Sequence, residues 1–127
     1  MPSHTRVKFG LALALLTMLA PAQALAQADC QLPIPPAAPN GRTATQQDIQ
    51  AAVTDARNYM SQADVYQQCL LDYVAAQKKQ AVEDKKTFDS YIETSTQKKI
   101  EDNQKTKIRV GAEINGALSD FKMAHPN

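Results

Sequence analysis

Apolar side chains repeat every seven residues over a long stretch that begins near position 49. The repeat consists of two rows: Ile49, Ala56, Ala63 and Leu70, then Ala52, Tyr59, Tyr66 and Tyr73. Residues seven apart lie on the same face of a helix, so the two rows form one apolar stripe of the kind that coiled coils use. No Gly or Pro occurs between Arg42 and Val110. The pattern predicts helix almost throughout this stretch.

Capping and breaking residues set the expected helix bounds. Thr43 with Gln46, and Thr45 with Asp48, both fit a capping box at a helix start. The stripe weakens after Leu70, and the run 94–96 is Thr-Ser-Thr, which is poor inside a helix and good at its start. We therefore predict a first helix over about 43–90, a turn near 91–96 and a second helix over about 97–123.

The apolar residues expected to face the first helix from the second are Ile100, Ile108, Ile114, Leu118 and Phe121, flanked by Val110, Ala112 and Ala117. The predicted fold is all-α, a long two-helix antiparallel hairpin. One continuous helix over 43–122 is the alternative. It would be about 120 Å long, and its stripe would need an oligomeric partner.

The segment 27–42 precedes the helices and has no helical period. It contains Pro33, Pro35, Pro36 and Pro39, followed by Asn40-Gly41, a turn signal. Proline favours an extended, polyproline-like chain, so the segment is expected to form an extended arm.

Cys30 and Cys69 are the two cysteines of the chain, and they lie 39 positions apart in the sequence. In an exported protein such a pair is expected to form a disulfide, worth about 4 kcal/mol by chain entropy. Two free thiols or an intermolecular bridge are the alternatives.

The expected turn also decides which part of the first helix the second helix covers. With a turn at 94, residue 121 would face about residue 67, leaving the earlier half of the first helix uncovered. The arm, with Leu32 and Ile34, is then expected to cover that part of the stripe.

The first 26 residues have the pattern of a cleavable secretory signal peptide. Arg6 and Lys8 precede an apolar run over 9–20, and Ala24-Leu25-Ala26 fits a cleavage site. Cleavage after Ala28 and an uncleaved membrane anchor are the alternatives, although a run of 12 residues is short for a span of about 20. We expect a periplasmic or secreted protein with no membrane span after cleavage.

Charge and residue types argue against several classes of function. Loss of Arg6 and Lys8 leaves 12 basic and 13 acidic residues, a balance that gives no overall field to attract nucleic acid. After residue 26 the sole histidine is His125, and no catalytic set, zinc spacing or phosphate loop is recognisable. We expect no enzyme activity, no cofactor and no metal site.

Two features are candidates for a partner-binding surface. The row Tyr59, Tyr66 and Tyr73 could form a ligand platform, although aromatic residues at this spacing more often form core. Lys85 and Lys86 lie in the segment 78–109, which has nine basic and six acidic residues. This segment could contact phosphate groups of lipid or lipopolysaccharide, but interleaved charges are more typical of a solvated surface.

Four short segments carry a resemblance: Cys30-Gln-Leu-Pro, Pro39-Asn-Gly41, Tyr66-Gln-Gln-Cys69-Leu70 and Asp120-Phe121-Lys122. The sequence resembles a group of small secreted helical proteins of Gram-negative bacteria. The resemblance implies an exported helical protein and assigns no activity. We therefore expect an interaction or structural module of the cell envelope, whose partner is an unidentified protein or envelope component. A holdase-like chaperone or stress protein is the alternative, and a homo-oligomer is compatible with either.

Overall fold

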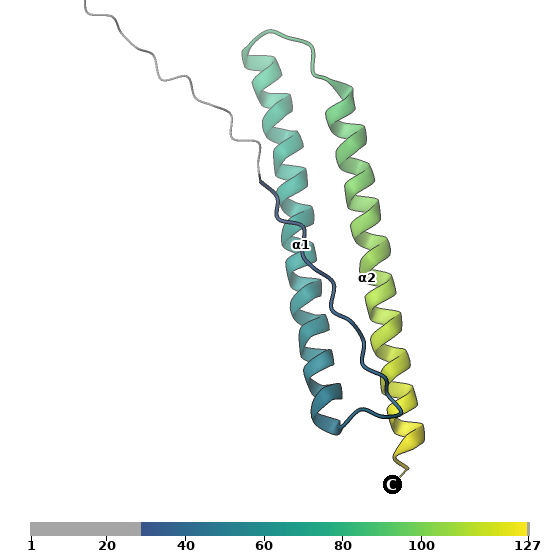
Figure 1. Ribbon diagram of the computed structural model, residues 1–127. Helices are drawn as coiled ribbons and strands as arrows, with labels where there is room; N and C mark the ends of the chain where they lie inside the picture. Colours follow the sequence, from purple (N-terminus) through teal and green to yellow (C-terminus); the bar gives the residue numbers. More distant parts are fainter. Residues whose placement is uncertain (1–28, 127) are drawn as a thin grey trace, which may run out of the picture.

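Two long antiparallel helices and an extended arm form the protein (Figure 1). The computed structural model describes residues 29–126. Helix α1 spans Gln46–Glu83 and helix α2 spans Ser90–Ala124. The prediction of an all-α hairpin is therefore confirmed, and the single-helix alternative is wrong. The predicted signal peptide lies outside the described residues. Within the described part, neither helix is both long and apolar enough to cross a membrane.

A capping box forms at the start of α1, and it is the predicted pair of Thr45 with Asp48. The Thr45 hydroxyl accepts from the Asp48 backbone N–H (3.2 Å), and the Asp48 carboxylate accepts from the Thr45 backbone N–H (2.8 Å). These bonds satisfy two backbone donors that a helix start leaves free. The pKa of Asp48 is lowered below its ordinary value, mainly by the hydrogen bond from the Thr45 backbone and secondly by the one from the Thr45 hydroxyl.

The turn lies at residues 84–89, so its predicted position at 91–96 is wrong. Lys85 takes a left-handed conformation (φ 54°), and Asp89 caps α2 by accepting from the Tyr91 backbone N–H at 2.9 Å. The residues 94–96 lie inside α2. Their hydroxyls do not break the helix because Thr94 and Ser95 donate to carbonyls three or four residues earlier.

The buried face of α1 is the predicted stripe. Its buried residues are Ile49, Ala52, Ala56, Tyr59, Ala63, Tyr66 and Leu70, whose spacing alternates between three and four. The buried face of α2 comprises Thr96, Ile100, Asn103, Val110, Ile114 and Ala117, with spacings of three or four except for one interval of seven between Asn103 and Val110. Ile108, which was expected to face α1, is 73% exposed. Of the other expected residues, Ile100, Val110, Ile114 and Ala117 are buried, so most of the predicted face of α2 is confirmed. The polar residues Thr96 and Asn103 of the interface were missed, because a search for apolar positions passes over them.

Helix α2 covers the whole of α1 and not only its later half. Near the turn Lys78 pairs with Glu93 (2.6 Å), and midway Lys107 pairs with Asp64. At the far end Phe121 packs with the cluster around Ile49. The earlier turn allows α2 to reach this end, so the stripe that was assigned to the arm is covered by α2.

The arm starts over α1 and then runs between the two helices toward the start of α1 (Figure 1). Its partly buried positions are Cys30, Pro33, Pro36, Ala38 and Pro39. All of these except Ala38 are three apart, which is the period of a polyproline II helix. Leu32 and Ile34 were expected to lie on the stripe, but they are 66% and 89% exposed. The three-residue period explains this outcome, because it turns residues 32 and 34 away from the groove.

Both ends of the arm are fixed to the helices. At its start Cys30 and Cys69 form the predicted disulfide, with Cα atoms 5.7 Å apart. At its end the Asn40 carbonyl accepts from the backbone N–H groups of Thr43 (3.1 Å) and Ala44 (2.9 Å). Gly41 lies against α2 so closely that a Cβ there would come within 2.0 Å of the Ala117 carbonyl oxygen. The arm is thus held between a covalent bond to α1 and a close backbone contact with α2.

Candidate functional site

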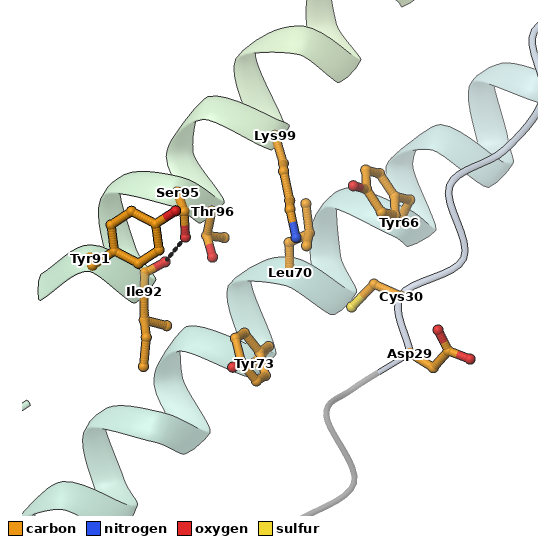
Figure 2. A pocket seen from close by; sticks show the side chains of 10 residues that line it. All are labelled: Asp29, Cys30, Tyr66, Leu70, Tyr73, Tyr91, Ile92, Ser95, Thr96 and Lys99. Carbon is orange, nitrogen blue, oxygen red and sulfur yellow. Dashed lines mark hydrogen bonds between the residues drawn. The ribbon is translucent and has the colours of Figure 1, made fainter. Parts of the chain in front are cut away.

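The groove between the helices continues beyond the arm toward the hairpin turn. This open part of the groove starts at Cys30 and has a volume of about 640 Å³. Figure 2 shows the side chains that line it, which come from the arm and from both helices: Asp29, Cys30, Tyr66, Leu70, Tyr73, Tyr91, Ile92, Ser95, Thr96 and Lys99. We call this region the open groove. It is a concave surface between the two helices that no described segment covers.

The predicted tyrosine row divides between the core and the open groove. Tyr59 and Tyr66 are only 3% and 7% exposed, so they cannot form a free binding surface in this conformation. Burial raises the pKa of both phenols, and for Tyr59 the charges of Arg109 and Lys107 partly offset this effect. Tyr73 is half-buried and lines the open groove. The core interpretation therefore holds for two of the three tyrosines, while the third is accessible.

The side of the open groove formed by α2 was not predicted from the sequence. Tyr91 is 73% exposed, and it lies with Ile92 opposite Tyr73 of α1 (Figure 2). These two residues occupy the positions that were assigned to the turn, so their place on a helix face was not anticipated. With the turn at 84–89, the first two turns of α2 place them beside the tyrosine row.

Cationic side chains border the turn end of the hairpin. Lys99 lines the open groove from α2 (Figure 2). Lys78 pairs with Glu93, and its ammonium lies 5.4 Å from the centre of the Phe88 ring, in the range of a cation–π contact. The predicted surface residues Lys85 and Lys86 are exposed in the turn itself. They do not line the open groove, so the structure does not bring them together with the tyrosine row.

A second exposed apolar surface lies beside the disulfide. Leu32 and Ile34 of the arm border a shallow depression with Val65 of α1, which is 68% exposed. This depression adjoins the open groove, because Cys30 and Tyr66 line both. The sequence analysis placed Leu32 and Ile34 on the apolar stripe. This surface was therefore missed, because its prediction requires knowing which side chains of the arm face the helices.

A polar group lies at the centre of the helix interface. The Asn103 side chain is 3% exposed and donates to the Ala63 carbonyl oxygen at 3.0 Å. Its own side-chain oxygen has no hydrogen-bond partner among the described residues. A polar group at such a position favours one register of two helices over others, because a shift would leave its buried amide N–H without the Ala63 acceptor.

The described residues contain no group of three or more His, Cys, Asp or Glu side chains placed to hold a metal ion. The open groove combines aromatic faces and hydroxyl groups with one acidic residue, Asp29, and one basic residue, Lys99. The fold and the groove define a disulfide-linked helical hairpin with an extended arm. No protein-family model matches the sequence, and comparisons with curated proteins and with solved structures found no significant match.

Proposed function

We propose that this protein is a non-enzymatic interaction module that acts outside the cytoplasm, in the cell envelope or beyond it. The observation that carries the proposal is the open groove: a concave, tyrosine-lined surface formed by three segments that a disulfide holds in place. A preorganised surface loses little conformational freedom on binding, which favours a specific partner.

The proposed location rests on two features. A disulfide persists in oxidising compartments and is rare in the cytoplasm, and Cys30 and Cys69 are joined. The pattern of residues 1–26 is that of an export signal. The resemblance to small secreted helical proteins agrees with this location.

A holdase-like chaperone is the second candidate, because several large apolar side chains are exposed. Those of Leu32, Ile34 and Val65 adjoin one another beside the disulfide. A holdase needs an extensive apolar surface that accepts many unfolded chains. Here the main apolar stripe of α1 is covered by α2, which favours a specific binder over a holdase.

In-cell photo-crosslinking tests the two candidates. A photoreactive phenylalanine analogue is placed at Ile34, Lys86 or Tyr91, with the exposed Ile108 as the control position. One dominant crosslinked protein from position 34 or 91, and none from 108, is the expected result. A broad set of unrelated proteins would support the holdase instead. Crosslinks that are equal at all positions would refute a specific interaction surface.

A further inference from the structure

The tyrosine row of α1 extends one residue beyond the arm that covers it. Tyr59 and Tyr66 lie beneath the arm, where they line a cavity of about 320 Å³ together with Leu32, Pro33 and Pro35. Tyr73 is the next residue of the row, but the disulfide at Cys30 ends the arm's contact before it. Among the described residues, the part of this surface beside Tyr73 is therefore open.

The spacing of the row matches an extended proline-containing chain. Tyrosines seven residues apart on a helix are about 10.5 Å apart along its axis. One turn of polyproline II, three residues, advances about 9.3 Å. The arm uses this match, since its prolines Pro33, Pro36 and Pro39 are partly buried at intervals of three, with Ala38 also partly buried beside the last of them. The arm is thus a bound example of the chain conformation that this groove accepts.

The open groove also supplies the hydrogen-bond donors that such a chain needs. A polyproline II backbone makes no internal hydrogen bonds, so its carbonyl groups require outside donors. The phenolic hydroxyls of Tyr73 and Tyr91 form no hydrogen bond within the described part of the chain, and both line the open groove. Grooves lined by aromatic residues are the sites at which other proteins bind proline-rich segments.

We infer that the open groove binds an extended segment of another protein that carries two prolines three residues apart. The inference rests on the proposed interaction role and names its ligand. The lining residues of α2 run from Tyr91 to Lys99, eight residues or about 12 Å. A polyproline II segment of about four residues spans that length, which is a proline, two other residues and a second proline.

Selection from a phage-displayed library of random ten-residue peptides tests this inference. The oxidised protein serves as the target, and a Tyr73→Ala/Tyr91→Ala variant serves to remove peptides that bind elsewhere. We expect the enriched peptides to share two prolines three residues apart. Fluorescence polarisation of one enriched peptide should then show affinity weakened about tenfold or more in the double variant, as for aromatic residues at the centre of an interface.

Two single variants keep the result interpretable. Tyr91→Ala changes a side chain that is 73% exposed, so it retains the fold and should weaken binding without lowering the melting temperature. Ile108→Ala removes an equally exposed side chain that does not line the open groove, so its affinity should match that of the wild type. Circular dichroism confirms the fold of each variant.

Three results would overturn the inference. In the first, no family of peptides binds the wild type better than the double variant. In the second, the enriched peptides do not share two prolines three residues apart. The third is a dimer in solution that the double variant dissociates, because the groove would then belong to a second copy of the chain. The interaction role has its own test, since a dominant partner crosslinked from Ile34 but not from Tyr91 would support that role and place it outside the open groove.

Discussion

Replacing Gly41 by alanine tests whether the arm and α2 are in backbone contact. A Cβ at this position would lie 2.0 Å from the Ala117 carbonyl oxygen and 2.9 Å from the Asp120 Cβ. Neither neighbour is the end of a flexible side chain, so the arm and α2 must separate. Gly41 does not have a positive φ, so the substitution adds no backbone strain of its own. The cost is therefore one of overpacking, about 1–3 kcal/mol of unfolding free energy.

Gly116→Ala is the matched control, because it adds the same methyl group to the same region. Gly116 lies inside α2, and an added Cβ there meets no atom within 4 Å. Alanine is the better helix former by about 0.5–1 kcal/mol, so this variant should be more stable than the wild type. The two variants should therefore change stability in opposite directions.

Urea unfolding followed by circular dichroism measures both effects on the oxidised protein. A change of 1 kcal/mol corresponds to about 4–8 °C in melting temperature for a domain of this size, so thermal unfolding provides a second measurement. A thiol assay confirms that Cys30 and Cys69 remain joined in each variant. If Gly41→Ala is as stable as the wild type while Gly116→Ala behaves as expected, the arm does not lie against α2 as described.

Three further predictions concern the disulfide, the core and the helix cap. Replacing Cys30 and Cys69 together by serine should lower the unfolding free energy by about 4 kcal/mol, because it frees a loop with a separation of 39 residues; a loss below about 1 kcal/mol in urea unfolding would contradict the constraint. Val110→Ala removes a fully buried side chain and should cost about 2 kcal/mol, whereas the exposed Ile108→Ala should change stability by less than about 0.5 kcal/mol in the same assay. The pKa of Asp48 is lowered in the folded state, so the stability that this carboxylate adds is present above its ordinary pKa of about 4 and is lost as the pH falls through the lowered value. Asp48→Ala should therefore lower the melting temperature at pH 7 and have a smaller effect near pH 3, and an equal effect at both pH values would refute the role of the charge.

The sequence allowed α1 and its buried face to be predicted because its interface is apolar and regular. All four residues of the row from Ile49 to Leu70 are buried, and the capping box at Thr45 forms as expected. The disulfide was also predictable, because two cysteines offer a single intramolecular pairing and the pattern of the first 26 residues is that of an export signal. These features depend on residue type and spacing alone.

The position of the turn could not be predicted in the same way. Residues 84–89 contain neither Gly nor Pro, and the left-handed position is taken by Lys85, a residue type that rarely adopts it. The stronger signal, Thr94-Ser95-Thr96, was misleading because hydroxyl groups inside a helix can donate to its own carbonyls. The choice between turn and helix at these residues was decided by packing, since Thr96 is buried against α1.

This one displacement of the turn accounts for the other corrections. Moving the turn of a hairpin by one residue shifts each facing position on the opposite helix by two. Phe121 therefore packs near Ile49, where the prediction had placed it opposite residue 67. Because α2 then covers the stripe, the arm moves into the groove between the helices and Leu32 and Ile34 become exposed.

The disulfide decides how much of that groove stays open. Cys69 lies between Tyr66 and Tyr73 in the sequence of α1, so the bond to Cys30 anchors the arm between these two tyrosines. An extended chain that could slide along the groove would be free to cover Tyr73 as it covers Tyr66. The covalent anchor prevents sliding, and the close contact of Gly41 with Ala117 fixes the other end. The two anchors together keep one part of a continuous surface filled by the protein's own arm and leave the part beside Tyr73 open.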